Sequence, residues 1–382
     1  MAAVRILHLH SSFDLGDPQS RTVRLMNHFG DQAEHTVLSA IPDAFGASHD
    51  LDRRVKVSFP KDAAPSLSGM PSMGRYRRLA GYMKKFHLVL SYNFGAMDGV
   101  MAHTLFTRSM KLPPLIHHED GFEHDEVDRL KWHRNWFRTI ALQRSNALVV
   151  PSKTLEHIAR TVWHQPLEKI ARFPNGIDTK HYNRRPQRGS FPGFQKRDGE
   201  IVVGTIAGLN KVKNLPRLLR AVAAAGPNIR LAIVGEGPER DVILSEATRL
   251  GIADRVMMPG HLRDPARYIR LFDIFALSSD SEQYPISLVE AMTSALPILS
   301  TDVGDVRNIV SRENRPFIVA RSDEDALALA IASLAKDAAL RETLAAANRL
   351  LACSQYDEET MFARYRQLYG SAMKRADFAR QS

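Results

Sequence analysis

The sequence contains one cysteine, Cys353, in 382 residues. A single cysteine cannot form an internal disulfide, and it cannot supply the Cys-rich ligand set of a structural zinc site. The sequence also lacks a run of about 18 apolar residues that could span a bilayer. Its opening residues, 1–8, are too short and too soon polar for a secretory signal peptide. We therefore expect a cytoplasmic protein, whose membrane contact, if it has any, is peripheral on the inner face.

The chain contains fewer acidic residues than basic residues. The chain has 52 Lys and Arg against 42 Asp and Glu, which leaves a formal net charge of +10. Such an excess favours anionic partners, such as nucleotide-activated substrates, lipid head groups or nucleic acid. Charge alone does not choose among these partners. The sequence shows no clear nucleic-acid-binding motif, so we expect no nucleic acid partner.

Short apolar segments of strand character alternate with segments of helical spacing. In the first half the predicted strands are 6–9, 36–38, 88–90, 115–116 and 147–150, and a helix is predicted at about 20–29. In the second half the predicted strands are 201–206, 231–234, 273–277 and 316–319, and a helix is predicted at 215–225. This alternation predicts an α/β fold with parallel sheets covered by helices. A chain of this length suits two domains of about 150 to 200 residues.

Pro174 and the Asn175-Gly176 pair interrupt the pattern, and about twenty residues rich in Arg, Pro and Gly follow Asp178. We therefore place a first domain at 1–178 and a second at 179–355, joined by a linker. A hinge at this linker would let two domains close on a substrate. A last helix is predicted at about 357–374.

Two carboxylates mark the candidate site of the second half. Glu282 lies in the loop after the 273–277 strand, and Glu290 lies in the helical segment that follows, with seven residues between them. In a doubly wound sheet, ligands bind beyond the carboxyl ends of the strands. Pro285 removes an amide that would be unpaired in a first helical turn, and the next amides can face an anion, because a helix N-terminus carries about half a positive charge. The alternative is structural: Ser287 and Glu290 also match a capping box, in which Glu290 folds back onto a backbone amide.

The segment from Glu282 to Glu290, continued by Ala291-Met292 and 296–299, resembles the Glu-x7-Glu signature of family 4 retaining glycosyltransferases, which have the GT-B fold. The similarity extends upstream through 231–238 and 254–256 to Gly260, and covers most of residues 201–320. It implies two Rossmann-like doubly wound domains that face each other across a cleft. The first would bind the acceptor, the second would bind the nucleotide sugar, and residues 356–382 would pack back on the first domain.

The resemblance also implies roles for individual residues. Glu282 would lie beside the donor sugar and Glu290 would hold the ribose of the nucleotide. Lys213 matches a basic residue that clasps the diphosphate, while Gly208 stands where the family commonly has Arg. The substrate-binding residues would be Gly16, Gly208, Gln283, Tyr284, Pro285, Ile286, Ser287 and Glu290. Gln283 and Ala295 replace glycines that are frequent in the family, and this leaves the identity of the donor open.

In the first half, Gly16 could let the backbone of the first strand-to-helix loop approach a phosphate. The 117–121 segment, His-His-Glu-Asp-Gly, gathers titratable groups that could orient an acceptor hydroxyl or accept its proton. The resemblance favours His118 as the residue near the transferred sugar, although members that read Glu-His-Gly here would put Asp120 at that position. The segment can also be a loop that satisfies its own hydrogen bonds, or a metal site, which the resemblance does not require.

Two segments of the first half combine basic and apolar residues. In the 73–86 helix, apolar residues recur at helical spacing between arginines and lysines, so the helix could lie on an anionic membrane surface, or it could be a surface helix with its apolar side on the core. Residues 124–144 are predicted to form one long helix that contains Trp132 and Trp136. Its aromatic and basic residues could serve nucleic acid, but core packing with a solvated Arg face explains them more simply.

The resemblance implies a retaining, metal-independent glycosyltransferase that moves a sugar from a nucleotide-diphosphate sugar to an acceptor hydroxyl without a cofactor. The acceptor would be a glycan or a lipid-linked molecule of polysaccharide or glycolipid synthesis. The alternatives are an epimerase or phosphorylase on the same architecture, and a non-catalytic nucleotide-sugar-binding protein. Two Asp-x-Asp triplets, 50–52 and 323–325, do not clearly follow a buried strand, and we discount them as metal sites.

Overall fold

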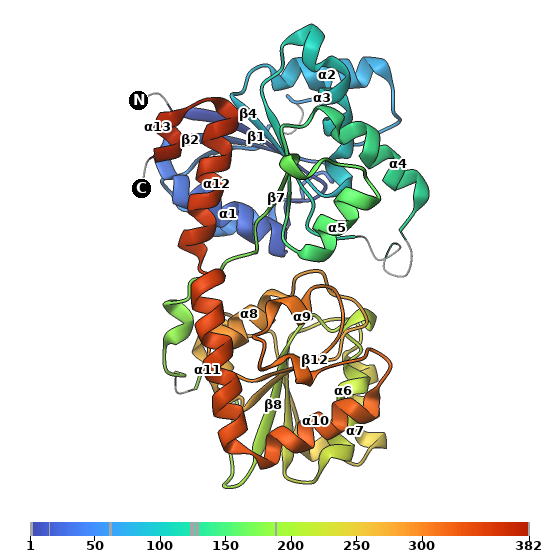
Figure 1. Ribbon diagram of the computed structural model, residues 1–382, viewed down its shortest axis with the longest axis vertical. Helices are drawn as coiled ribbons and strands as arrows, with labels where there is room; N and C mark the ends of the chain where they lie inside the picture. Colours follow the sequence, from blue (N-terminus) through green and yellow to red (C-terminus); the bar gives the residue numbers. More distant parts are fainter. Residues whose placement is uncertain are drawn as a thin grey trace. The chain divides into compact units, whose positions relative to one another are not determined.

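The computed structural model describes residues 3–14, 16–60, 63–122, 126, 130–187 and 189–380. The chain divides into two compact units. Unit 1 consists of Met1–Asn175 together with Thr360–Ser382, and unit 2 consists of Gly176–Glu359. The last helices of the chain therefore belong to the same unit as its N-terminal half (Figure 1).

Within the described residues, unit 1 is built on a seven-stranded sheet in the order β3-β2-β1-β4-β5-β6-β7, and the neighbouring strands run parallel. The strands are β1 (Val4–His10), β2 (Ala33–Ser39), β3 (Lys56–Ser58), β4 (Leu88–Tyr92), β5 (Leu115–His118), β6 (Ala147–Val150) and β7 (Ile170–Arg172). The strand order reverses between β1 and β4, which makes that point the topological switch of a doubly wound sheet.

Helices cover both faces of this sheet because successive strand residues point to opposite sides. The helices of unit 1 are α1 (Asp17–Phe29), α2 (Met73–Met83), α3 (Met97–Met110), α4 (Trp132–Ala141), α5 (Lys153–Thr161), α12 (Glu358–Met373) and α13 (Ala376–Arg380). Leu7 and Leu9 of β1 share one core cluster with α2, α3 and α5, whereas Ile6 shares another with α1, α12 and α13.

Unit 2 repeats this topology. In the described residues its parallel sheet has the order β10-β9-β8-β11-β12-β13, with the reversal between β8 and β11. The strands are β8 (Ile201–Ile206), β9 (Ile229–Val234), β10 (Val256–Gly260), β11 (Ile274–Leu277), β12 (Ile298–Thr301) and β13 (Ile318–Val319). The helices are α6 (Leu215–Ala225), α7 (Arg240–Arg249), α8 (Ile286–Thr293), α9 (Val306–Ile309), α10 (Glu324–Lys336) and α11 (Ala338–Gln355). One core cluster contains residues of α6, α7 and α10, and the other contains residues of α8, α9 and α11.

Side-chain oxygens fix the start of several helices. An oxygen of Ser72, Ser152, Asn214, Asp323 or Asp337 accepts a hydrogen bond from the backbone amide three residues later, at the start of α2, α5, α6, α10 and α11 respectively. A cap of this kind typically contributes about 1 kcal/mol. One of the two Asp-x-Asp triplets therefore has a structural explanation, because Asp323 caps α10.

The predicted parallel α/β architecture is confirmed in both halves of the chain. The long helix predicted at 124–144 is wrong in extent. The α-helix covers only Trp132–Ala141 and ends in a short 3-10 turn, Leu142–Arg144, while residues 124, 125 and 127–129 lie outside the described residues. Searching the described residues finds no helix long and apolar enough to cross a membrane.

Candidate functional site

Two loops meet at the topological switch of unit 2. One follows β8 and contains the short 3-10 helix η8 (Lys211–Lys213), and the other follows β11 and leads into α8. Lys213 Nζ donates a hydrogen bond to Glu282 Oε1 at 2.6 Å, and Ser279 Oγ donates to the same oxygen at 2.7 Å. The side chains of Lys213 and Glu282 are 23% and 9% exposed. The structure thus brings together two of the residues that the sequence singled out.

Hydrogen bonds connect the two loops directly. The backbone amide of Asp280 donates to Val212 O at 2.7 Å, and Asn214 Nδ2 donates to Asp280 Oδ2 at 3.0 Å. Ser278 Oγ lies 3.0 Å from the carbonyl oxygens of both Lys213 and Asn214. These bonds fix the backbone on either side of Lys213, so the position of its ammonium group depends on the loop that carries Glu282.

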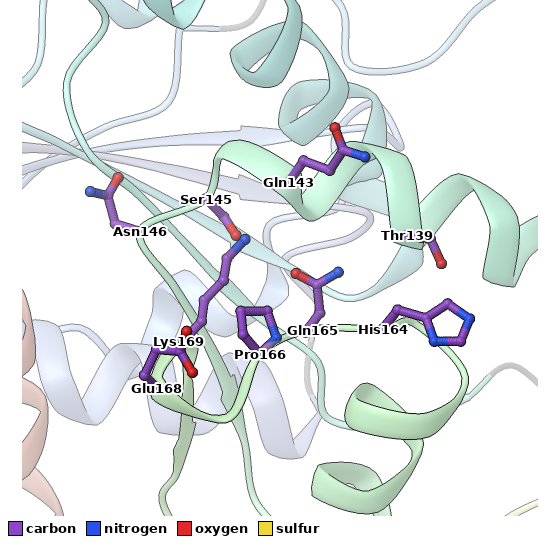
Figure 2. Close-up of a pocket in the computed structure, with 9 residues that line it drawn as sticks. All are labelled: Thr139, Gln143, Ser145, Asn146, His164, Gln165, Pro166, Glu168 and Lys169. Atoms are coloured by element: carbon purple, nitrogen blue, oxygen red, sulfur yellow. The ribbon is translucent and has the colours of Figure 1, made fainter.

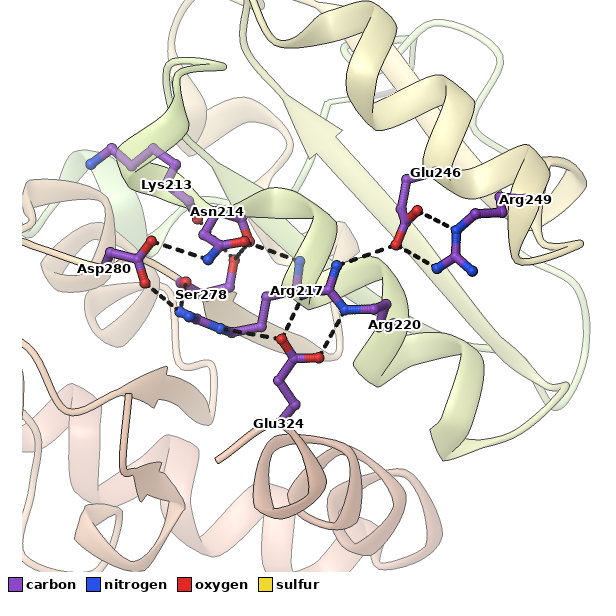
Figure 3. A network of polar contacts seen from close by, with 9 residues as sticks. All are labelled: Lys213, Asn214, Arg217, Arg220, Glu246, Arg249, Ser278, Asp280 and Glu324. Carbon is purple, nitrogen blue, oxygen red and sulfur yellow. Dashed lines mark hydrogen bonds and ion pairs between the residues drawn. The ribbon is translucent and has the colours of Figure 1, made fainter. Parts of the chain in front are cut away.

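Arg217, in the first turn of α6, reinforces this connection. Its Nη1 donates to Ser278 O at 2.9 Å and lies 2.8 Å from Asp280 Oδ1. Asn214 precedes the helix in the left-handed region, with φ 43° and ψ 50°, and its side chain accepts a hydrogen bond from the amide of Arg217. Figure 3 shows the side chain of Lys213 extending away from these contacts, so that they hold its backbone while its ammonium group binds Glu282.

A second group of ion pairs continues from Arg217 toward the outside of unit 2 (Figure 3). Arg220 binds both oxygens of Glu324, at 2.8 and 2.6 Å, and lies 3.2 Å from Glu246. Hydrogen bonding to Arg249, more than any other contact, lowers the pKa of Glu246 to about 2. Because Arg220 and Glu324 are more than a third exposed and Arg249 is exposed, we expect these ion pairs to orient α6, α7 and α10 more than to stabilise the unit.

The start of α8 differs from the capping box that the sequence offered as an alternative. The helix begins at Ile286 with Pro285 as its N-cap and with no side-chain cap hydrogen bond, so Ser287 lies inside the first turn and the capping box is not formed. Pro285 is buried and Ser287 is half-buried. Pro285 thus stands one position before the first helical residue, and the amides of the first turn remain the group predicted to meet an anion.

Glu290, one turn into α8, is held by a residue that the sequence did not single out. The hydroxyl of Tyr182 donates a hydrogen bond to Glu290 Oε1 at 2.5 Å. Burial is the main cause that raises the pKa of the Tyr182 phenol above its ordinary value, and the nearby Glu290 carboxylate raises it further. Tyr182 lies in the segment predicted as linker, where no periodic pattern could have indicated a site residue.

Two close backbone approaches at this site require glycine. Gly304 has φ 55°, and a Cβ placed on it would lie 2.0 Å from the carbonyl oxygen of Glu282. Gly235 has φ 146°, and its Cβ would lie 2.0 Å from Ala207 O, in the loop after β8. Gly208 differs from both. It is exposed, it is not among the residues with positive φ, and its Cβ would lie no closer than 3.5 Å to the nearest neighbouring atom, so a side chain fits there.

Of the two predicted site residues of unit 1, Gly16 is exposed and His118 is buried. Gly16 is exposed and precedes α1, with φ 177°, an extended conformation that any residue adopts. His118 is 1% exposed. Its Nδ1 lies 3.2 Å from Ser91 O, and its Nε2 lies 3.0 Å from the hydroxyl of Tyr369 on α12. Burial, followed by the charge of Arg21, holds the pKa of His118 well below its ordinary value.

The other polar residues after β5 are also held inside unit 1. Asp120 forms a buried ion pair with Arg21, and Glu119 Oε2 lies 3.1 Å from Arg138 Nε and 3.5 Å from His117 Nε2. The structure thus pairs these residues with side chains inside unit 1, although Glu119 Oε1 is buried without a hydrogen-bond partner among the described residues. A search of the described residues finds no group of three or more His, Cys, Asp or Glu that could hold a metal ion.

A separate hollow of about 550 Å³ lies in unit 1 (Figure 2). Lys169 at its wall donates a hydrogen bond to Leu142 O, and burial lowers the pKa of its ammonium group to about 8. None of the predicted site residues belongs to its lining, which consists of Thr139, Gln143, Ser145, Asn146, His164, Gln165, Pro166, Glu168 and Lys169.

Comparison with known proteins relates this chain to sugar-transferring enzymes. The family described as Glycosyl transferases group 1 matches residues 187–350, which lie in unit 2. N-acetyl-alpha-D-glucosaminyl L-malate synthase of Bacillus anthracis is 24% identical over 212 residues, which are 55% of this chain and 56% of that protein. The UDP-Gal:alpha-D-GlcNAc-diphosphoundecaprenol alpha-1,3-galactosyltransferase of Escherichia coli is 22% identical over 305 residues, 76% of this chain and 77% of that protein. The chain spans about half the length of the first curated relatives that it matches.

Solved structures identify the fold. HepE from Anabaena, in complex with UDP, matches with a TM-score of 0.80 and 18% identity, over 96% of this chain and 100% of that chain. Sucrose-phosphate synthase from Thermosynechococcus elongatus matches with a TM-score of 0.74 and 18% identity, over 97% and 99% of the two chains. The two parallel sheets with their helices confirm the predicted GT-B fold.

Proposed function

We propose that the protein is a retaining, metal-independent glycosyltransferase that moves a sugar from a nucleotide-diphosphate sugar to an acceptor hydroxyl. The observation that carries this proposal is the 2.6 Å ion pair between Lys213 and Glu282 at the topological switch of unit 2. It lies in the segment that matches the glycosyltransferase family, beside the start of α8. Switch points of this kind are where open α/β sheets bind nucleotides.

Lys213 and the amides of residues 286 and 287 are assigned to the diphosphate. Breaking a glycosyl phosphate bond leaves negative charge on the departing diphosphate, and a fixed ammonium group and free helix amides both offset that charge. Because the loop contacts already hold the backbone of Lys213, little reorganisation is needed when the charge develops. Loss of one such contact typically costs about 3 kcal/mol, which is a factor of about one hundred in rate.

Glu290 and Glu282 are assigned to the two ends of the donor. Glu290, oriented by Tyr182, binds the ribose hydroxyls, and Glu282 lies beside the donor sugar, where its carboxylate favours positive charge at the anomeric carbon. The bond from the anomeric carbon to the diphosphate breaks and the bond to the acceptor oxygen forms on the same face of the sugar, and the hydroxyl proton of the acceptor passes to the departing phosphate oxygen. No covalent nucleophile, metal or cofactor is assigned.

UDP sugars are the first donors to test, because HepE was solved in complex with UDP and the galactosyltransferase relative is described as using UDP-Gal. Gly208 lacks the cation that the family commonly has at this position. Gln283 places a side chain where glycine is frequent, and we assign it, with Tyr284, to the pocket that selects the sugar. The non-catalytic alternative and the epimerase alternative gain no specific support from the geometry.

The acceptor is proposed to be a glycan or a lipid-linked molecule, bound by unit 1 from the cytoplasmic side of the membrane. We assign Gly16 to the substrate-binding part of that unit. His118 was predicted to contact the sugar or acceptor, but both of its ring nitrogens are within hydrogen-bond distance of Ser91 O and the Tyr369 hydroxyl. A contact with substrate would therefore require Tyr369 to move, and we assign His118 no step in the reaction.

The test is a screen of UDP and GDP sugars by thermal shift, since a ligand that binds the folded state raises its stability. The donor that raises Tm is then incubated with lipid-linked and oligosaccharide acceptors, and the anomeric configuration of the product is read by NMR. The proposal predicts transfer with retention and its loss on Glu282→Gln. Donor binding without transfer to any acceptor would favour the non-catalytic alternative, and sugar conversion without an acceptor would favour the epimerase.

A further inference from the structure

Helix α4 carries two tryptophans whose side chains are largely exposed. Trp132 is 79% exposed and Trp136 is 62% exposed. They are four residues apart and therefore lie on the same side of the helix. The opposite side already provides the packing of α4, because Arg138 is fully buried and Phe137 packs against the core of unit 1. The exposed tryptophans consequently contribute little to the stability of unit 1.

In the described part of the chain, cations without a carboxylate partner accompany these tryptophans on the neighbouring helices. The exposed cations of the segment that contains α2 and α3 are Arg77, Arg78, Lys84, Lys85, Arg108 and Lys111, and among the described residues none of the six forms an ion pair with a carboxylate. Between residues 63 and 118 the only acidic residue is Asp98, which is engaged by Arg75 at 2.6 Å and by the hydroxyl of Tyr76 at 2.9 Å. No acidic residue occurs between 130 and 155, whereas six occur between 119 and 128, among them Glu119 and Glu126, which pair with the buried Arg138.

These residues belong to one layer of helices. Helix α3 packs against α2 on one side and against α4 on the other, and Figure 1 shows the three helices side by side on unit 1. Leu105 of α3 is 46% exposed, and Met70 and Met73 at the start of α2 are 88% and 63% exposed. We call the solvent-facing side of α2, α3 and α4 the basic aromatic face.

The structure also decides which part of this face could enter a bilayer. The predicted membrane contact of the 73–86 segment relied on its apolar residues, but Tyr76, Leu79 and Met83 are buried in the core of unit 1. Helix α2 therefore offers cations to the solvent, with Met73 at its first turn. The aromatic side chains that are available lie on α4.

We propose that the basic aromatic face binds the surface of an anionic lipid bilayer, with Trp132 and Trp136 inserted at the level of the head groups. Tryptophan prefers this interface because its ring is apolar while its indole N–H can hydrogen bond. Lysine and arginine next to an anionic surface each contribute about 1 kcal/mol, which corresponds to about fivefold in binding. The proposal concerns unit 1 alone, and its test needs no nucleotide sugar.

The experiment uses the full chain and vesicles of phosphatidylcholine with and without phosphatidylglycerol. We expect sedimentation with the anionic vesicles only, weakened by salt. Trp132→Ala with Trp136→Ala should lower the binding at least about tenfold, since each indole loses its interfacial contact. The variant Arg77→Gln, Arg78→Gln, Lys84→Gln and Lys85→Gln should lower it by about fivefold per cation removed.

Matched control variants test whether vesicle binding depends on this face or only on the total charge and the exposed apolar side chains of the protein. Arg53→Gln, Arg312→Gln, Arg315→Gln and Lys336→Gln remove the same charge from exposed positions elsewhere, and Leu329→Ala with Leu350→Ala removes two exposed apolar side chains of unit 2. Both control variants should bind as the parent chain does. Trp163, the third tryptophan, is fully buried, so a blue shift of the emission on vesicles reports Trp132 and Trp136.

The proposal is overturned if anionic vesicles do not bind, or if the control variants lose as much binding as the face variants. It is also overturned if the emission does not shift on vesicles, or if the face variants lose binding to a short single-stranded RNA while vesicle binding is absent. Far-UV circular dichroism and Tm of each variant should equal those of the parent, because the substituted side chains are exposed.

Discussion

The ion pair between Lys213 and Glu282 predicts that substitution of Lys213 weakens the binding of UDP, whereas substitution of Glu282 does not. Replacing Lys213 by Met removes the cation assigned to the diphosphate. A hydrogen bond to a charged group contributes about 1.5 to 3 kcal/mol, so UDP should bind about 10- to 150-fold more weakly. Uridine, which has no phosphate, should bind the variant and the parent chain equally.

Replacing Glu282 by Gln should not weaken the binding of the nucleotide. In the unliganded structure Glu282 Oε1 lies 2.6 Å from Lys213 Nζ and competes with a phosphate for it. Two unit charges about 4 Å apart attract each other by about 4 kcal/mol at the effective dielectric constant of a protein surface, and the 23% exposure of Lys213 reduces this further. Gln keeps the shape and removes the competing charge, so UDP should bind equally well or up to about tenfold more tightly. Turnover should nevertheless fall by about one hundredfold.

Isothermal titration calorimetry with UDP and with uridine, at one fixed ionic strength, measures these changes. Lys336→Met is a suitable control, because it removes an exposed lysine of the same unit. The reasoning is refuted if both substitutions weaken UDP to a similar extent. It is also refuted if Lys213→Met weakens uridine as much as UDP.

Three further predictions address the loops and unit 1. The Gly208→Arg variant should fold normally, since a Cβ at this position would lie 3.5 Å from its nearest neighbour. Because the arginine adds a cation, calorimetry should show that the variant binds UDP about tenfold more tightly. An unchanged affinity for UDP would mean that Gly208 does not lie near the diphosphate. Gly304→Ala should lower the free energy of unfolding by at least about 2 kcal/mol in urea, more than Gly199→Ala, because both glycines have positive φ but only Gly304 faces a carbonyl oxygen. Burial lowers the pKa of both His10 and His35 to about 3, with the charge of Arg21 a second cause for His10. In the unfolded chain these histidines bind protons near the ordinary pKa of about 6.5. The free energy of unfolding is therefore highest above pH 6.5, and it decreases at lower pH, by about 2 kcal/mol per histidine at pH 5. Urea titrations at pH 7.5 and pH 5 test this, and equal stabilities would contradict it.

Those parts of the fold that depend on local chemistry could be predicted from the sequence. Helix α6 begins and ends where it was expected, at residues 215 and 225, because Asn214 caps it, a proline fits its first turn and Gly226 ends it. Buried parallel strands are largely apolar, which is why nine of the strand segments could be recognised. The sequence did not predict β3, β7, β10 and β12 as strands, and the short strands β3 and β7 are partly exposed.

The remaining features depend on contacts between residues that are far apart in the chain. Tyr182 and Glu290 are separated by 108 positions, so no local pattern could reveal the tyrosine that orients the carboxylate. His118 and Tyr369 are separated by 251 positions, and the sequence could not show that α12 covers the histidine. Helical spacing in α2 revealed an apolar side but could not tell whether that side faces the core or a membrane.

The central claim is that a nucleotide diphosphate is bound by Lys213 and the start of α8, and a crystal structure of the chain with bound UDP tests it most directly. The account predicts a phosphate oxygen within hydrogen-bond distance of Lys213 Nζ and of the amides of Ile286 or Ser287, with Glu290 on the ribose. A structure in which UDP lies elsewhere, for example in the hollow beside Lys169, while Lys213 stays bonded to Glu282, would contradict it.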